Sequence, residues 1–179
     1  NMGQNLERVR QNIVMKNMHK QLQILSVTDP LTGVYNRMGC EQIAFPYIEK
    51  NYGEGKWSFM IFLDVNKMKV INDSYGHEQG DLALKLVAKC IQLSVPEEWI
   101  VARYGGDEFL VAGTTEDDGE VNRICEHITE MLTKVSVERN LPYQLSVGIG
   151  TVYIDPEEEL DLHRALRVAD AKMYAMKKN

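Results

Sequence analysis

Residues 57–65, WSFMIFLDV, form a nearly unbroken apolar run, and this run constrains the fold more than any other feature of the chain. A strand without alternating polar residues is buried on both faces, so helices must cover the sheet on each side. Four segments with apolar residues at helical spacing supply such helices: residues 37–50, 78–93, 121–139 and 160–178. With further strands among them, this order predicts an α/β sandwich, in which a mixed central sheet is flanked by helices.

A Gly-Gly-Asp-Glu sequence at residues 105–108, called the acidic turn below, lies between the apolar segments 99–102 and 109–112. The pattern predicts a β-hairpin, because paired glycines give the backbone the freedom, including positive φ, that a tight turn requires. Two carboxylates next to bare backbone suit a metal ion and a phosphate-bearing ligand. An ordinary acidic hairpin turn would explain the same four residues.

Asp64 comes near the end of the apolar run, where an unpaired buried carboxylate would be costly. If the run and the hairpin are neighbouring strands, Asp64 and Asp107 lie at the same end of the sheet. Two carboxylates with carbonyls nearby suit a hard cation such as Mg²⁺, whereas strand capping or salt bridges to surface lysines are the alternative. An EF-hand loop beginning at Asp64 is excluded, because its sixth and twelfth positions are Lys69 and Tyr75 instead of glycine and glutamate.

The segment 72–81, NDSYGHEQGD, is dense in side chains that form hydrogen bonds. Asn72 and Asp81 can recognise the edge of a base, since an amide both donates and accepts and a carboxylate accepts from N–H groups. Asp73 and Asp81 equally suit helix or turn caps, which is the commoner use of Asp beside Gly. His77 can form a hydrogen bond within its own loop.

The chain of 179 residues has a net charge of −6, which argues against a general nucleic-acid-binding protein but not against a nucleotide substrate. Its three cysteines are widely spaced without a CxxC pair, so neither a zinc site nor a disulfide framework is expected. No apolar run is long enough to span a membrane, and no signal-peptide pattern is present. We therefore expect a cytoplasmic protein without direct membrane contact, either alone or as the cytosolic part of a larger sensor protein.

Residues 5–27 have apolar side chains at steps of three and four and predict a long amphipathic helix. Pro30 and Gly33 follow it and favour a turn, so we expect a boundary between a helical linker, residues 1–28, and a globular domain, residues 29–179. Such a helix pairs with a second copy in a two-stranded coiled coil, or lies back on its own domain. A shift of register in the middle of the helix weakens the heptad pattern.

Several motifs together resemble the GGDEF family, the diguanylate cyclases. They occur in this order: DPLTGVYNR at residues 29–37, LDVNKMKVIND at 63–73, GHEQGD at 76–81, RYGGDEF at 103–109, LSVGIG at 145–150 and ADAKMYAMK at 169–177. The resemblance covers nearly everything after residue 28. It implies the palm-like sandwich shared with class III nucleotidyl cyclases, in which two domains, each holding one GTP, face each other and produce cyclic di-GMP and two pyrophosphates.

The resemblance also implies a metal site and a mode of assembly. Mg²⁺, or Mn²⁺, would be bound by Asp64, the carbonyl of Val65 and Asp107, and Glu108 would support the metal site or order the turn. We expect Asp107 to organise the metals and to accept a proton, two roles that are hard to separate. Because each domain holds one GTP, catalysis requires a homodimer, which the N-terminal helix would align in response to an upstream sensor.

The resemblance places GTP against residues from separate motifs. Asn72 and Asp81 would hold the guanine base, with His77 close to the nucleotide. Lysines would contact the phosphates and the glycines of the acidic turn would let the backbone approach the nucleotide: these residues are Lys69, Lys177, Gly105 and Gly106.

The chain departs from the family pattern at several positions. Residues 96–99, PEEW, lack both the Arg and the Asp of the inhibitory product-binding RxxD motif, so we expect no feedback inhibition through that site. Met68 and Asn66 replace a usual Phe and a frequent Asp, and both are tolerable because neither is a main metal ligand. A phosphate-binding Arg of the family would lie beyond Asn179.

Two other functions are compatible with these motifs. The first is a catalytically weak domain that binds GTP as a regulatory module. The second is a relaxed base preference that yields mixed dinucleotides, against which Asp81 argues because a carboxylate there pairs well with guanine N–H groups and poorly with adenine.

Overall fold

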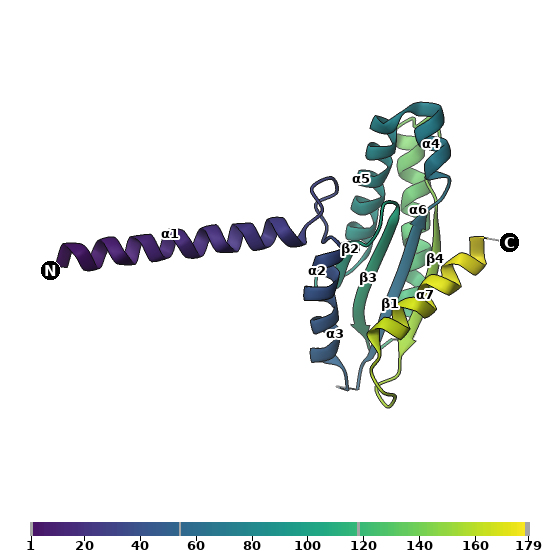
Figure 1. The fold of residues 1–179 in the computed structure, drawn as a ribbon. Coiled ribbons are helices and arrows are strands. Elements are labelled where there is room, and N and C mark those ends of the chain that lie inside the picture. Colours follow the sequence, from purple (N-terminus) through teal and green to yellow (C-terminus); the bar gives the residue numbers. More distant parts are fainter. Residues whose placement is uncertain (1, 54, 118, 178–179) are drawn as a thin grey trace.

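A four-stranded sheet forms the centre of the fold (Figure 1). The computed structural model describes residues 2–53, 55–117 and 119–177. Within them the strands, in the spatial order β2-β3-β1-β4, are β1 Trp57–Val65, β2 Ile100–Arg103, β3 Glu108–Thr115 and β4 Val147–Ile154. β1 has a neighbour on each side and is buried from Ser58 to Leu63, which confirms the prediction from its apolar run.

The strand directions differ from the mixed sheet that we expected. β1 pairs antiparallel with β3 and with β4, and β2 pairs antiparallel with β3. The helical crossovers do join parallel strands, as the order of elements suggested, but each crossover skips one position in the sheet. β3 therefore lies between β1 and β2, and β1 lies between β3 and β4. In the described part of the chain, parallel pairing is confined to an isolated bridge between Tyr35 and Ala102.

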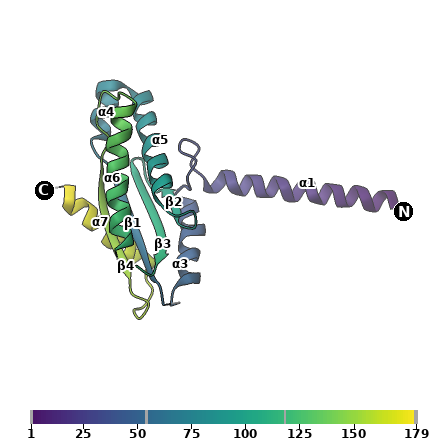
Figure 2. The same cartoon turned by 180° about the vertical axis from the view of Figure 1, so that it is seen from behind.

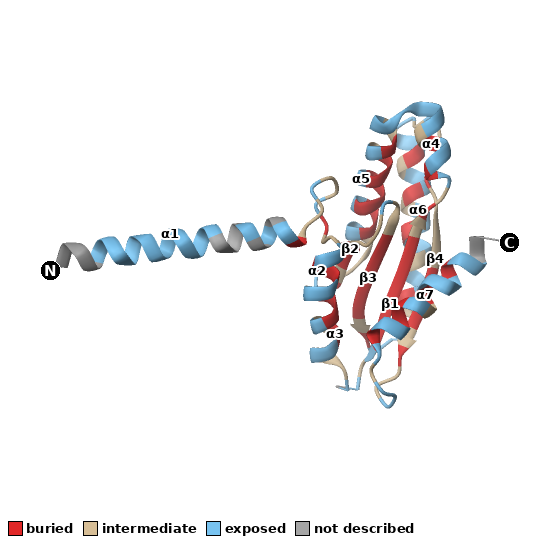
Figure 3. Ribbon diagram, viewed as in Figure 1, coloured by how far each residue is buried: buried red, intermediate tan, exposed pale blue. Residues whose placement is uncertain are grey.

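Helices cover both faces of the sheet, which confirms the α/β sandwich (Figures 1 and 3). One face carries α4 Met68–Tyr75, α5 His77–Ser94 and α6 Glu120–Glu138, and the other carries α7 Leu162–Lys177 and the helical segment 37–51. The side chains of β1 alternate between two cores. Phe59, Ile61 and Leu63 belong to the first, and Met60 and Phe62 belong to the second.

The helical segment 37–51 is interrupted, unlike the continuous helix expected over residues 37–50. It consists of α2 Arg37–Gly39, a π-helical turn η1 Cys40–Ala44 and α3 Phe45–Asn51. Pro46 explains the interruption, because its ring lacks an N–H and would clash with the carbonyl four residues earlier in a regular α-helix. The π-helical register instead lets the N–H of Phe45 donate to the carbonyl of Cys40.

β4 begins later than the strand expected over residues 143–152, and the close backbone packing predicted from its glycines is present at Gly150. A Cβ atom there would lie 2.1 Å from the carbonyl oxygen of Ala169 and 2.5 Å from the nitrogen of Met173, both in the backbone of α7. Gly150 thus sets how closely α7 approaches the sheet.

We expect Gly150→Ala to lower the free energy of unfolding by about 2 kcal/mol, because two backbone atoms of α7 must be displaced. Urea unfolding measures the change. Gly106→Ala is the matched control, since a Cβ there meets no atom within 4 Å and should change stability by less than about 1 kcal/mol. Equal stability of the two variants would show that α7 does not depend on this close approach.

The long helix α1, Met2–Val27, projects away from the sheet and does not lie back on it (Figures 1 and 2). Large apolar side chains are exposed along it, including Leu6, Val14, Met18 and Leu22 at 64%, 57%, 59% and 62%. No helix in the described ranges is long and apolar enough to cross a membrane. The helix therefore presents apolar surface that the rest of the chain does not cover.

Candidate nucleotide and metal site

The end of β1 and the acidic turn lie side by side, as predicted. Asp64 is paired with Glu108 in the sheet, and the N–H of Val65 donates to the carbonyl of Asp107 at 2.9 Å. This backbone contact brings Asp107 next to the last residues of the central strand. Metal binding by these residues stays a prediction.

The acidic turn is closed by the carbonyl of Glu108, which accepts the N–H groups of Tyr104 at 2.8 Å and Gly105 at 3.2 Å. The positive φ expected at the paired glycines is wrong, because among described glycines only residues 33, 53, 55 and 76 have one. Gly105 meets a different constraint. A Cβ there would lie 2.2 Å from Oε2 of Glu108, so glycine makes room for that carboxylate, whereas a Cβ at Gly106 would meet nothing within 4 Å.

The residues at this end of the sheet fit a magnesium ion that is bound together with its substrate. The donors predicted from the sequence are all oxygens, from the carboxylates of Asp64 and Asp107 and the carbonyl of Val65. Among the described residues no group of three or more His, Cys, Asp or Glu side chains is arranged to hold a metal. Mg²⁺ typically uses one or two carboxylates and completes its shell with water and substrate phosphates, so this donor set suits it.

The segment predicted to recognise a base forms the junction of α4 and α5. Gly76, with φ of 88°, joins the two helices, and α5 begins there without a side-chain cap. The capping role considered for Asp73 and Asp81 is therefore not seen at this helix terminus. Asn72 packs against α5, because a Cβ at Gly80 would lie 1.9 Å from Oδ1 of Asn72.

The remaining predicted residues are distributed around this junction. Lys69, His77 and Asp81 are exposed on α4 and α5. The side chain of Lys177 lies outside the described part of the chain, although its backbone ends α7. Tyr143, in the loop before β4, contacts α5 through its hydroxyl, which donates to the carbonyl and Oε1 of Gln79 at 3.0 Å each.

A large groove lies elsewhere, between α6 and the edge strand β4. Its volume is about 1080 Å³, and Asn66, Cys125, Glu126 and Ile149 are among the residues that line it. None of the predicted site residues lines this groove, and burial raises the pKa of the Cys125 thiol to about 11, which keeps the thiol protonated at neutral pH.

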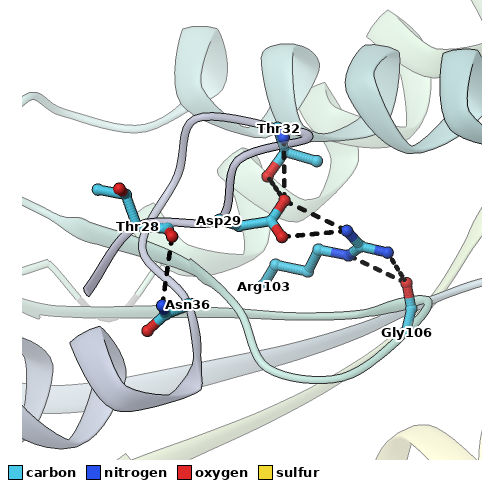
Figure 4. Close-up of polar contacts among 6 residues, drawn as sticks. All are labelled: Thr28, Asp29, Thr32, Asn36, Arg103 and Gly106. Carbon is cyan, nitrogen blue, oxygen red and sulfur yellow. Dashed lines mark hydrogen bonds and ion pairs between the residues drawn. The ribbon is translucent and has the colours of Figure 1, made fainter. Parts of the chain in front are cut away.

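A contact that the sequence did not predict joins the acidic turn to the segment after α1 (Figure 4). Asp29 forms an ion pair with Arg103 at 3.2 Å, and Arg103 also donates to the carbonyl of Gly106. Burial raises the pKa of the Asp29 carboxyl, but hydrogen bonds from Thr32 and the charge of Arg103 together outweigh it and hold the pKa below its usual value. Both residues lie in the motifs quoted above, but nothing in the sequence pairs positions 74 residues apart.

A sandwich of this kind, with an acidic turn beside the end of its central strand, has the fold of solved GGDEF domains. The family model for the diguanylate cyclase GGDEF domain matches residues 26–179, and the chain belongs to this family.

Known relatives place the family match in context. The probable diguanylate cyclase DgcJ of Escherichia coli is 29% identical over 154 residues, which cover 86% of this chain and 30% of DgcJ. The cyclic di-GMP phosphodiesterase NbdA of Pseudomonas aeruginosa is 31% identical over 158 residues, which cover 86% of this chain and 20% of NbdA. The chain thus spans less than a third of either protein.

A solved structure matches almost the whole chain. The coiled coil and GGDEF domain of DgcB from Caulobacter crescentus, in complex with c-di-GMP, has a TM-score of 0.87 at 23% identity. The match covers 98% of this chain and 93% of that one, and at this identity it shows the fold.

Proposed function

We propose that this chain is a diguanylate cyclase, which condenses two GTP molecules into cyclic di-GMP and releases two pyrophosphates. The observation that carries the proposal is the backbone contact between Val65 and Asp107, because it brings the residues Asp64 and Asp107 to the same end of the sheet. The domain acts as the output of a larger signalling protein, in keeping with the small share of its curated relatives that it spans.

The proposed reaction is an in-line attack by the 3′-hydroxyl of one GTP on the α-phosphorus of another. The new P–O bond forms as the bond to pyrophosphate breaks, and the hydroxyl proton is lost to a base or to water. Asp64, Asp107 and the carbonyl of Val65 would hold Mg²⁺ or Mn²⁺ for this step. When bound, the metal lowers the pKa of the attacking hydroxyl and stabilises charge on the attacking and leaving oxygens.

The other site residues have proposed roles in holding the substrate. Asp81 accepts from the N–H groups of guanine and Asn72 donates to and accepts from its edge, with His77 close by. Lys69 and Lys177 contact phosphates, while Gly105 and Gly106 leave space for the nucleotide beside the backbone. Glu108 orders the acidic turn through its place beside Gly105.

The reaction joins two nucleotides, and each domain offers one set of these residues, so we propose that two copies face each other. The exposed apolar side chains of α1 supply the surface on which they associate. The similar structure from Caulobacter crescentus also contains a coiled coil and a GGDEF domain.

Incubation of the dimer with GTP and Mg²⁺, followed by product identification, tests the proposal. Cyclic di-GMP and pyrophosphate in a one-to-two ratio are expected. The competing function is a GTP-binding regulatory module. The match to NbdA, a phosphodiesterase, supports this alternative because a relative of this chain is named for an activity other than cyclisation. GTP binding without any cyclic di-GMP would favour the regulatory module.

We expect Gly80→Ala to raise the KM for GTP about tenfold, because the new Cβ displaces the amide of Asn72 and one good hydrogen bond to the base is lost. The helix itself should persist, since alanine is the better helix former. Steady-state kinetics of Gly80→Ala, Asn72→Ala and the double variant check the mechanism. Additive losses in the double variant would contradict it, because both changes should remove the same contact.

A further inference from the structure

We propose that Asp29 is a positioning residue for the acidic turn, and that it acts through Arg103 on the carbonyl of Gly106. The inference rests on the proposed cyclase function for its kinetic part and on the geometry of the contacts for the rest. Asp29 lies two residues beyond the end of α1, outside the predicted metal and nucleotide residues.

Arg103 uses its guanidinium group to join two parts of the chain. Nε and Nη2 donate to the carbonyl oxygen of Gly106 at 3.0 and 2.6 Å, while Nη1 lies 3.2 Å from each carboxylate oxygen of Asp29. The planar group thus holds the carbonyl with one edge and the carboxylate with another. The side chains of Arg103 and Asp29 are only 16% and 15% exposed, so solvent screens their attraction weakly.

Hydrogen bonds within its own loop also hold Asp29 in place, independently of Arg103. Its Oδ2 accepts the backbone N–H of Thr32 at 2.9 Å and the hydroxyl of Thr32 at 2.6 Å. The loop is closed by the N–H of Gly33, which donates to the carbonyl of Asp29 at 2.8 Å, and Gly33 has a φ of 76°. The carboxylate therefore acts as a fixed support that orients the guanidinium (Figure 4).

The carbonyl of Gly106 is the point at which this support reaches the proposed site. Gly106 precedes Asp107, whose own carbonyl accepts the N–H of Val65. Arg103 thus holds the carbonyl of Gly106, and Val65 holds the carbonyl of Asp107. These hydrogen bonds on two successive carbonyls fix the direction in which the side chain of Asp107 leaves the backbone. Gly106 has no side chain of its own to anchor it, and a Cβ there would touch nothing within 4 Å.

Asp29→Asn tests the proposal, because it removes the charge that holds Arg103 while keeping an oxygen for Thr32. We expect kcat to fall between about tenfold and 100-fold, the loss typical of a small misplacement of a catalytic group. The KM for GTP should change less than about twofold, since Asn72 and Asp81 are untouched. The exchange of the Gly105 amide proton, which closes the turn, should become faster.

The matched control is Asp117→Asn, which breaks an exposed ion pair with Arg123 beyond the far end of β3. It should leave kcat, KM and the exchange of Gly105 unchanged. If Asp29→Asn does not fold, Arg103→Lys is measured instead, since a lysine ammonium keeps a charge near Asp29 but cannot reproduce the fork to Gly106. Arg103→Lys should show the same loss in kcat.

Unchanged Gly105 exchange and a kcat within about twofold of the parent in a folded variant would overturn the positioning role. A lower kcat that comes with a lower thermal stability, while exchange of the Gly105 amide is unchanged, would also overturn it. Such a result would indicate a purely structural ion pair. Amide exchange needs no turnover, so absence of cyclic di-GMP formation by the parent chain would reject the proposed function and leave the positioning role separately testable.

Discussion

Asp107→Ala lowers metal-dependent turnover of GTP by at least about 1,000-fold, because it removes a carboxylate expected to hold the metal where charge develops. The fold should persist. The contact that fixes Asp107 against β1 is made by its backbone carbonyl to the N–H of Val65, and alanine retains that carbonyl. The free energy of unfolding should therefore change by less than about 1 kcal/mol, as for substitutions away from structural contacts.

The measurement combines turnover with a titration of Mg²⁺ or Mn²⁺. If Asp107 binds the metal, a higher metal concentration should recover part of the activity of Asp107→Asn, which keeps one oxygen ligand, but not that of Asp107→Ala. Asp117→Ala serves as the control, because its carboxylate is at the opposite end of β3 and exposed. Full activity in Asp107→Ala would reject the metal role, and loss of structure would show that the carboxylate supports the fold instead.

Periodicity predicted the elements of this fold better than their geometry. The unbroken run of β1 is sufficient to place it in the centre, because no edge or half-exposed strand tolerates so little polarity. Strand direction was harder to predict, because a helical crossover can skip a position and leave an antiparallel neighbour between parallel strands. The π-helical turn before Pro46 has a local cause, but the continuous helical pattern around it conceals that cause.

In the site, too, the sequence indicated which residues carry the chemistry but not which distant residues contact one another. The motifs located Asp64 and the acidic turn, and the structure brings them together. They could not show that the carboxylate of Glu108 folds back beside Gly105, in the space that a Cβ there would take. Nor could they pair Asp29 with Arg103, because a contact between a loop residue and the end of a distant strand depends on how the sheet closes and leaves no periodic trace.

The double substitution Val14→Glu and Met18→Glu should separate the dimer into monomers. At about micromolar protein concentration, where weakly associating chains are mostly monomeric, turnover per chain should fall at least tenfold. Both side chains are more than half exposed on α1, one helical turn apart, and lie together on one face with Gln11 and Met15. When two copies of α1 pair, this change would place four carboxylates close together in the apolar contact between the helices, called the seam below. A charge buried there without a partner is strongly unfavourable.

The rate law separates loss of association from damage to the site. For the double variant the rate should rise with the square of protein concentration, whereas the parent dimer should show a rate proportional to concentration. Asn12→Glu with Lys16→Gln is the matched control, since it also lowers the net charge of α1 by two but on the face away from Val14. Sedimentation should show a dimer for the parent and the control and a monomer for the seam variant. If the seam variant stays dimeric and active, the two domains must associate through a surface other than α1, and α1 would then not determine how the domains meet.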